Sequence, residues 1–593
     1  MRYLITLAIC CSFMACQDRV ESSTKNIPMN AELASLFEDY QSKMYEYYPL
    51  QATFAGIEGY NDKLNNDLDP SFKKKVIEEV GSIKAQMKEI DKSSLNNKDQ
   101  MSYDVMMWEL DMSLAEDNFP KEDYLPIDQM WSANLGFGQL ASGAGAQPFT
   151  KVEDYDNWLK RVDVFLDWTR TAQGNMKEGI DKGVVLPTSL VKKVIPQVSS
   201  WGEGSVTDHL FYSPAKNIPD DINDEDKRRI EGEYARMVRE RVMPVYKSFG
   251  DFLKSDYLEA SRETSGIGAL DFGEAYYDHQ IKKYTTTTMT ADQIHALGLS
   301  EVARLRSEME GVKKQVGFEG DLKAFFEHVR SRKELMPFTD PQQVIDNFNA
   351  IHDKMKPQLA KLFDTTPKAA FEVRRTEAFR EKSASAEYNP GSLDGSRPGI
   401  FYVPIPDVTK YNIYSDEDLF LHEAIPGHHY QISLQQEDED LPDFRKTLWY
   451  SAYGEGWALY TESLGKELGL YDDPYQFFGM LGAEMHRAIR LVVDTGIHSK
   501  GWTREKAIQY SLDNEAESEA SIISEIERYM ANPGQALSYK IGQLKIRELR
   551  ARAEEKLGDK FDIRAFHNEI LEPGCIPLAL LEQKIDRWIA SRS

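Results

Sequence analysis

The sequence predicts a mainly α-helical protein with little β structure. Two observations support this fold class: most segments after residue 30 carry apolar residues three and four apart, and the strict alternation typical of strands is rare. In chain order, the expected helices cover residues 31–48, 72–90, 152–182, 226–254, 291–316 and 341–362. The best strand candidate is 399–404 (GIFYVP), and the chain shows no repeat of fixed period.

The first residues of the chain are typical of an export signal. Arg2 precedes an apolar run over 4–15, which is too short to span a bilayer and ends at Cys16. The tripeptide before Cys16 resembles a bacterial lipobox, so we expect residues 1–16 to be a lipoprotein signal peptide and Cys16 to be lipidated. A plain signal peptide cut nearby is the alternative.

The polar residues 17–30 would serve as a tether between the lipid and the folded protein. The chain is therefore expected to be an exported lipoprotein of the bacterial cell envelope, held at a membrane by its lipid anchor and facing the periplasm or the outer surface.

The size of the chain predicts more than one packed unit. Because 593 residues exceed one ordinary core, we expect an N-terminal helical half over 31–270 and a C-terminal helical half over 271–593. Near the start of the second half, Thr290 followed by Gln293 predicts a helix cap. The net charge is −26 and no basic patch stands out, which argues against a nucleic-acid partner.

A cluster of histidines marks the C-terminal half. Five of the 11 His lie between 422 and 498, namely His422, His428, His429, His486 and His498. The stretch HEAIPGHH begins with His422 and Glu423, the order found in metallopeptidase helices, where the Glu is the general base. Ser415 is expected to cap this helix, with Asp418 at its third position.

The second histidine departs from the standard spacing His-Glu-x-x-His. On a straight helix, six residues place His428 roughly 120° from the face of His422, and seven residues place His429 about 10.5 Å along the axis. Neither position suits a shared zinc ion, whose Zn–N bonds are about 2.0–2.1 Å. A bulge at Pro426 and Gly427 would absorb two residues and return His428 to His422, with His429 as the alternative ligand. Otherwise, the adjacent pair would be ordinary surface histidines at a helix end.

A third ligand is expected from the next helix, over 451–470. Glu455 lies in GEGWALYTESL, where a carboxylate beside Trp457 is hard to bury unless it is paired or bound to a metal. Glu462 lies seven residues further on, on the same face of this helix as Glu455. We interpret it as a solvated carboxylate or as one that hydrogen-bonds to a ligand without binding the metal. The sequence therefore predicts a site for one Zn²⁺ ion.

A polar stripe crosses the apolar helix expected over 484–499. Arg487, Arg490, Asp494 and His498 recur at spacings of three, four and seven residues and so share a face. Arg487 or His498 is expected to hold a substrate carboxylate or carbonyl. Pairing between Arg490 and Asp494 is as good an interpretation of those two residues as a functional role.

Several motifs in series give the chain a family resemblance. It resembles the bacterial family catalogued as domain of unknown function 885, and the resemblance covers nearly all of the mature chain. The motifs that carry it are HEAIPGHHYQ, GEGWALYTESL, RLVVDTGIHSKGWT, YMANPGQALSYKIG, DGSRPGIFYVP (394–404) and TTTMTADQIHALGLSEVARLRSEM (286–309). The motif order is also similar to that of helical zinc peptidases such as thimet oligopeptidase, neurolysin and angiotensin-converting enzyme. That resemblance implies a large zincin-like helical fold, a two-lobed clamshell with a deep groove, whose C-terminal half is catalytic.

The resemblance to the zinc peptidases also assigns roles to residues. It implies that His422 and His428 are the first two zinc ligands, Glu455 the third and Glu423 the general base. The two extra residues before His428 leave His429 as its competitor.

Further residues are expected near the substrate. The segment 533–539 is similar to the Gly- and Tyr-containing segment that helical zinc peptidases place over the metal, which implies that the Tyr539 hydroxyl stabilises the oxyanion. Tyr529 is the alternative. Arg397, in the motif DGSRPG, is expected to face the groove.

The expected function is that of a zinc-dependent metallopeptidase acting on oligopeptides. Metal-activated water attacks the peptide bond, Glu423 moves the proton to the leaving amine, and zinc and Tyr539 stabilise the oxyanion. A metal-dependent hydrolase of another amide, such as a cell-wall peptide or a small molecule, is one alternative. A non-catalytic peptide-binding lipoprotein is another, although a binding module needs no base.

Overall fold

The computed structural model describes residues 29–592 except 131, 144, 378–380, 382–383, 394 and 396. The predicted lipidation site, Cys16, and nearly all of the predicted tether lie outside the described residues. The described part of the chain is mainly α-helical with three short strands, which confirms the predicted fold class. Within it, no helix combines the length and the apolar character needed to cross a bilayer.

The helices predicted over 31–48, 72–90 and 152–182 are present with bounds within two residues of the predicted ones, and the first half contains further helices that were not predicted. In chain order, the helices of the first half are α1 (Ala31–Tyr47), α2 (Pro49–Phe54), α3 (Pro70–Glu89), α4 (Asn97–Glu116), α5 (Lys121–Tyr124), α6 (Ala133–Ala141), α7 (Val152–Lys182), α8 (Thr188–Ser200), α9 (Ser213–Lys216), α10 (Asp224–Met237), α11 (Met243–Phe252) and α12 (Leu258–Ala260). The π-helical turns Val238–Val242 and Leu253–Tyr257 join the last three into one continuous helix, which includes the predicted helix 226–254.

The helices of the second half include α21 (Pro474–Ser499), most of whose residues are buried. In chain order they are α13 (Gly273–Thr285), α14 (Ala291–Gln315), α15 (Leu322–Ser331), α16 (Pro341–Met355), α17 (Asp416–Glu423), α18 (His428–Glu437), α19 (Asp443–Lys446), α20 (Ser451–Glu462), α21 (Pro474–Ser499), α22 (Arg504–Asn514), α23 (Glu519–Ala531), α24 (Ser538–Leu557), α25 (Ile563–Leu571) and α26 (Leu578–Arg592). The α20 helix ends at Glu462, eight residues before the end of the predicted helix 451–470.

Helix caps explain some of these boundaries. Thr290 and Gln293 form the predicted capping box at the start of α14. Ser415 is the N-cap residue of α17 and Asp418 its third residue, as predicted, but the Ser415 side chain makes no capping hydrogen bond. The acids of the first turn bond to other elements instead: Asp416 accepts from Asn347 and Tyr411.

A small sheet lies in the C-terminal half. Strands β1 (Phe371–Arg375), β2 (Glu387–Asn389) and β3 (Gly399–Val403) pair in the order β1-β3-β2, with β1 parallel and β2 antiparallel to β3. The central strand, β3, is the strand predicted over 399–404. Its residues are mostly buried, as expected for a strand covered on both faces.

Two helix pairs form the centre of the C-terminal half. The α14 helix packs along α21, and α20 packs along α24. Gly456 and Gly542 meet at the second contact, where a Cβ on either residue would collide with the opposite backbone. Because both residues are glycine, the helix that carries Glu455 lies directly against the helix that begins at Ser538.

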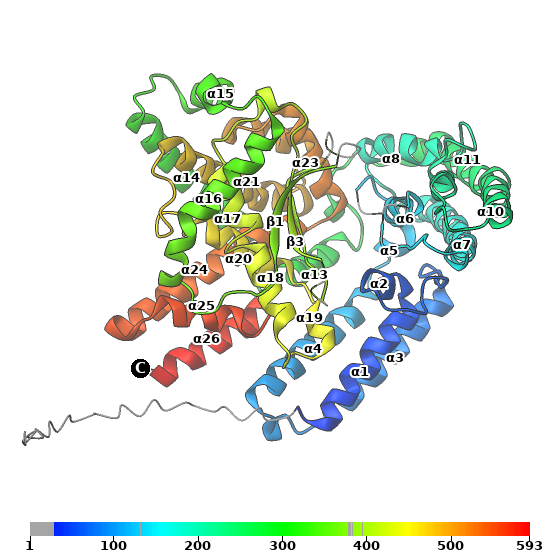
Figure 1. Cartoon of the computed structure of the whole chain (residues 1–593), viewed down its shortest axis with the longest axis horizontal. Helices are drawn as coiled ribbons and strands as arrows, with labels where there is room; N and C mark the ends of the chain where they lie inside the picture. The colour runs from blue at the N-terminus through cyan, green and yellow to red at the C-terminus, as the bar shows by residue number, and fades with distance from the viewer. Residues whose placement is uncertain are drawn as a thin grey trace, which may run out of the picture.

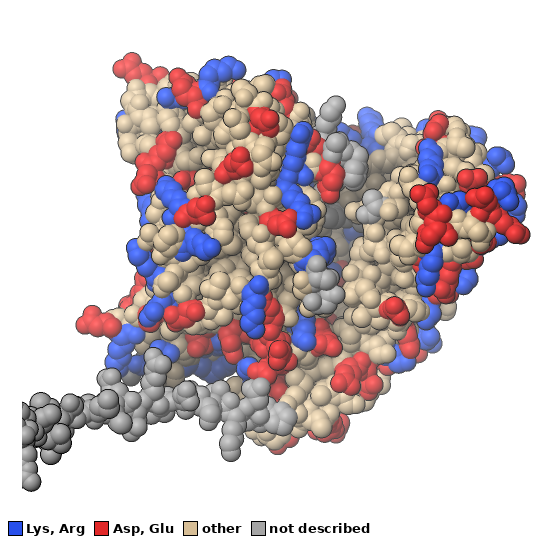
Figure 2. All heavy atoms as spheres, viewed as in Figure 1, with Lys and Arg blue, Asp and Glu red and all other residues tan. Residues whose placement is uncertain are grey.

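Figure 1 shows how the two halves are arranged. Helices α6–α11 gather at one end of the molecule, α1–α4 lie beneath them, and the helices after α13 form the larger mass with the sheet. Figure 2 shows that the surface is hollowed between that end and the larger mass, and that acidic and basic side chains are interspersed on this face.

Candidate metal centre

The predicted helix of the HEAIPGHH motif is broken into two. The α17 helix ends at Glu423, the residues after it form turns and bends, and α18 begins at His428. The Ile425–Pro426 peptide bond is cis. A Cβ on Gly427 would collide with the carbonyl oxygens of Leu421 and His422, so the chain at this point passes too close to α17 for any other residue.

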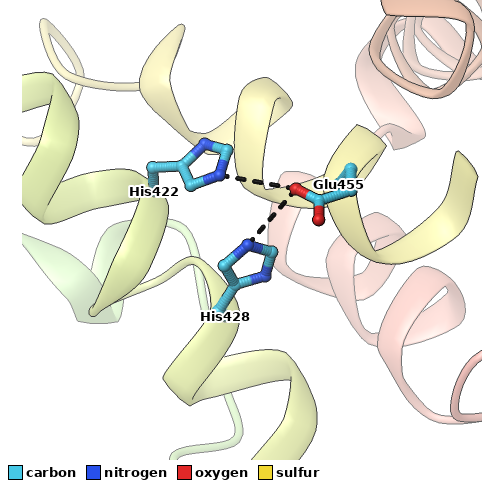
Figure 3. Close-up of side chains that lie close together, drawn as sticks. All are labelled: His422, His428 and Glu455. Atoms are coloured by element: carbon cyan, nitrogen blue, oxygen red, sulfur yellow. Dashed lines mark ion pairs between the residues drawn. The ribbon is translucent and has the colours of Figure 1, made fainter. Parts of the chain in front are cut away.

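The break brings the two predicted histidines together with Glu455. The Nε2 atoms of His422 and His428 lie 3.5 Å and 3.4 Å from Oε2 of Glu455, and one donor atom of each residue lies within 4.8 Å of the other two (Figure 3). A tetrahedral site with bonds of about 2.1 Å separates its ligand atoms by about 3.4 Å. The donor set and its spacing therefore fit one zinc ion.

Charge interactions within this cluster are strong. Burial opposes ionisation of Glu455, but His428 and His422 outweigh it and hold the pKa of Glu455 below its ordinary value. For His422, burial is outweighed by hydrogen bonds to Glu455 and Glu462, which raise its pKa to about 10. A metal ion would have to displace this proton, because only a neutral imidazole binds metal.

Side chains next to the cluster hold it in place through hydrogen bonds. Glu462 is 1% exposed and accepts a hydrogen bond from Nδ1 of His422 at 2.7 Å, so of the two interpretations of this residue the one in which it hydrogen-bonds to a ligand holds. Trp457 donates from Nε1 to the carbonyl of Pro426 at 2.8 Å. Glu455, Trp457 and Glu462 all belong to α20, so one helix fixes both a ligand and the break between α17 and α18.

Glu423 lies beside the cluster without a hydrogen-bond partner among the described residues. Its side chain is buried, and burial raises its pKa, although the nearby His422 and His428 oppose this rise. The charge of Arg487 also opposes the rise in the pKa of Glu423. A buried carboxylate with a raised pKa and no fixed partner can accept and return a proton.

His429, the alternative ligand, faces away from the cluster. Its Nδ1 lies 2.9 Å from the Tyr388 hydroxyl in β2, and its ring packs against Phe371 in β1. Burial, with a smaller contribution from His352, lowers its pKa to about 4. The packing of α18 on the sheet therefore points His429 at the strands and His428 at Glu455.

The two candidate tyrosines lie in different surroundings. Tyr539 is close enough to Glu455 for the carboxylate to act on its pKa, which burial raises, and its ring lies under the Arg490 guanidinium at 4.6 Å. Tyr529 donates its hydroxyl proton to Glu525 at 2.6 Å and accepts from Arg490. Tyr529 is thus engaged in a buried ion network, which leaves Tyr539 as the candidate nearer to the cluster.

The residues predicted to bind substrate are only partly brought to the site. Arg487 lies 4.0 Å from Glu462 and leaves Nε without a partner. Both ring nitrogens of His498 are used by the backbone, since Nδ1 accepts from Ile267 and Nε2 donates to Tyr529. Arg397 is an exposed residue of the loop before β3. Its charge opposes the rise that burial causes in the pKa of Tyr388.

The polar stripe of α21 makes different pairs from those considered. Asp494 bonds to the hydroxyl of Tyr277 at 2.5 Å and to the backbone of Gly534, whereas Arg490 bonds to Glu525 and Tyr529. The interpretation of Arg490 and Asp494 as partners of each other is therefore wrong. Both residues share a face of α21, but different neighbouring elements reach them.

Sequence reasoning missed two features around the cluster. Asp418 is 3% exposed, and its pKa is raised well above the ordinary value by burial and then by the Glu462 charge. Its place four residues before His422 on α17 is a signal that could have identified it. Trp449 packs its ring 5.7 Å from the His428 ring, and no local pattern predicts that contact.

A large cavity lies next to the cluster. It measures about 1120 Å³, and its lining includes residues of α1, α3 and α4 together with Trp449, Tyr450 and Ser451. Because Ser451 begins α20, the cavity wall and the helix that bears Glu455 are parts of one continuous segment. The first half of the chain thus supplies most of the lining of this cavity.

The fold and the site define a large helical protein with a buried His-His-Glu cluster beside an extended cavity. The chain belongs to the family described as "Bacterial protein of unknown function (DUF885)", which matches residues 49–585. This membership confirms the family resemblance of the sequence motifs. No curated protein matches the chain significantly.

Two solved structures are similar over almost their full lengths. One is described as "the putative lipoprotein from Colwellia psychrerythraea"; it is 29% identical, with a TM-score of 0.85, and the match covers 94% of this chain and 99% of that one. The other is described as "a putative lipoprotein of unknown function from Shewanella oneidensis"; it is 19% identical, with a TM-score of 0.75 and coverage of 93% and 99%. The second match shows the shared fold alone.

Proposed function

We propose that the protein is a zinc-dependent peptidase. One observation carries the proposal: His422, His428 and Glu455 present three donor atoms within 4.8 Å of one another, with both histidines at 3.4–3.5 Å from the carboxylate. The buried carboxylate of Glu423 directly follows the first histidine. Three protein ligands with a fourth position open are typical of catalytic rather than structural zinc.

Zinc bound by these side chains would supply a Lewis acid that polarises the substrate carbonyl and makes water nucleophilic near neutral pH. Glu423 accepts the proton of the attacking water and returns it to the leaving amine. Its raised pKa brings it closer to the pH at which both transfers are efficient. The Tyr539 hydroxyl, which burial keeps protonated, donates to the oxyanion that forms on the substrate.

The size of the cavity favours oligopeptides as substrates. Its volume of about 1120 Å³ exceeds the roughly 300–1,000 Å³ of ordinary small-molecule pockets and can hold several residues of an extended chain. Arg487, which lies beside Glu423 and Glu462, is proposed to hold a carbonyl or carboxylate of that chain.

We also propose that the protein is an exported lipoprotein anchored through Cys16. The signal pattern of residues 1–16 supports this placement, and the two similar structures are described as putative lipoproteins. The peptide substrates would then be peptides of the cell envelope.

The test uses the mature protein and its variant Glu423→Gln, with zinc content measured by atomic emission and hydrolysis followed on fluorogenic oligopeptides. We expect the wild type to bind one zinc ion per chain and to hydrolyse peptides. The variant should keep its zinc and lose about 10²–10⁴-fold in kcat, because only the proton acceptor is removed.

The neighbouring histidines provide a matched control. His428→Ala should lose stoichiometric zinc, whereas His429→Ala should keep it, since only His428 faces Glu455. Full activity in Glu423→Gln, or a wild type that binds no zinc, contradicts the proposal.

A further inference from the structure

One carboxylate in the large cavity has no cation to neutralise it. Glu109, on α4, lines the cavity and accepts a hydrogen bond from the Tyr450 hydroxyl at 2.7 Å. Among the described residues it forms no ion pair, and Lys283 acts on it only through longer-range electrostatics. A half-buried carboxylate whose direct partner is a neutral hydroxyl is costly to keep ionised.

Two other acids of the same cavity already have their cations. Glu116 pairs with Lys283 at 2.5 Å, and Asp123 pairs with Lys73. In agreement with this difference, His279 and Lys283 outweigh burial and lower the pKa of Glu116 to about 2, whereas burial raises that of Glu109. Glu109 thus resembles one half of an ion pair whose other half comes from outside the chain.

Aromatic rings line the same cavity as this carboxylate. The wall of the cavity includes Tyr40, Tyr48, Trp108, Phe444, Trp449 and Tyr450. Tyr40 lies close enough to Glu109 for the carboxylate to add to the rise that burial causes in the pKa of Tyr40. Ring faces attract cations and shield them from water, and a carboxylate then fixes the cation's position. The lining therefore suits an ammonium or guanidinium group on an apolar stem.

The cavity and the metal centre share a wall. Trp449 lines the cavity and also packs 5.7 Å from the His428 ring, while Tyr450, which donates to Glu109, immediately precedes the helix that carries Glu455. A peptide bound with one bond at the cluster would extend along Trp449 into the cavity that Glu109 lines.

We propose that Glu109 binds a Lys or Arg side chain of the peptide substrate and so makes the protein selective for basic peptides. This inference rests on the proposed peptidase function, because it assigns the cavity to the same substrate. The ion pair that forms in the cavity replaces the unmet charge of Glu109, and the aromatic wall holds the aliphatic stem of the bound side chain.

The test compares N-acetylated peptides that differ at one side chain, Lys against norleucine and Arg against citrulline, so that the amino terminus carries no charge. We expect kcat/KM of the wild type to favour the cationic member of each pair about 10-fold or more. In Glu109→Gln, which keeps an acceptor for Tyr450 but not the charge, this ratio should fall toward one. The matched control Asp123→Asn, whose residue is already paired with Lys73, should keep the ratio.

A binding measurement separates this inference from the proposed function. Calorimetric titration of Glu423→Gln with the same peptides should show the cationic member binding about 10-fold tighter, and Glu109→Gln in that background should remove the difference. Selective binding without hydrolysis by the wild type overturns the peptidase proposal and supports the role of Glu109. Hydrolysis of both members at equal rates, or a ratio unaffected by Glu109→Gln, overturns the role of Glu109 and leaves the peptidase proposal in place.

Discussion

Glu462 determines which nitrogen of His422 faces the cluster. The carboxylate accepts the Nδ1 proton at 2.7 Å, which leaves Nε2 as the atom directed at Glu455. Arg487 lies 4.0 Å from Glu462 and balances its charge. A carboxylate in this position orients a ligand histidine and increases its basicity.

Replacing Glu462 tests that role at the scale of one residue. We expect Glu462→Gln to fold but to bind zinc about 10–100-fold more weakly, because the His422 ring loses its fixed tautomer. Competition with a fluorescent chelator measures the affinity, and circular dichroism checks the fold. Zinc affinity equal to that of the wild type would show that Glu462 does not support the ligand.

At the scale of secondary-structure elements, the break between α17 and α18 replaces the straight helix of the standard motif. The two additional residues are absorbed in the turn, and Trp457 of α20 holds the carbonyl of Pro426 there. Gly427 allows the turn to pass against the end of α17. The predicted bulge at Pro426 and Gly427 thus takes the form of a complete helix break.

We expect Gly427→Ala to damage both the junction and the site. The added Cβ would collide with backbone carbonyls of α17, which should reduce the free energy of unfolding by about 1–3 kcal/mol and move His428 away from Glu455. Denaturant unfolding and zinc titration measure the two effects.

Gly174→Ala is the control for this substitution. Gly174 is exposed in the middle of α7 with nothing within 4 Å of an added Cβ, so the change should stabilise the protein by about 0.5–1 kcal/mol. If Gly427→Ala behaves like this control, the tight turn is not required.

At the scale of the whole molecule, two neutral histidines connect distant parts of the chain. His498 joins α21 to the backbone of Ile267 and Tyr529, and His567 of α25 joins the backbone of Leu362 to the hydroxyl of Tyr460. Burial lowers the pKa of each to about 3 from the ordinary 6.5. Between these pH values the unfolded chain binds these protons and the folded chain does not.

The stability that these two neutral histidines contribute should therefore be lost as the pH falls below 6.5. Each of the two histidines contributes a decrease of about 1.4 kcal/mol per pH unit in the free energy of unfolding. Denaturant unfolding of the metal-free protein at pH 7, 6 and 5 measures the slope. His498→Gln and His567→Gln should each be less stable at pH 7 but should have a shallower slope. Slopes equal to that of the wild type in both variants would show that these histidines are not buried in the neutral form.

The sequence by itself determined the helical class, the cap at Thr290 and the strand over 399–403. It also determined that His and Glu side chains suited to a metal lie between 422 and 455. Each of these is a local pattern, because periodicity, capping and neighbouring ligand types depend on residues a few positions apart. The same reasoning did not predict the partners of Arg490 and Asp494, which come from other helices.

Only the tertiary structure decided which histidine turns toward His422. His428 and His429 are adjacent, and the choice depends on contacts with Tyr388 and Glu455, which are 41 and 27 residues away from them in the chain. It likewise placed Glu109 of α4 against Tyr450 in the wall of the cavity. Such contacts arise from how long helices pack against one another, and a single sequence carries no local signal for that packing.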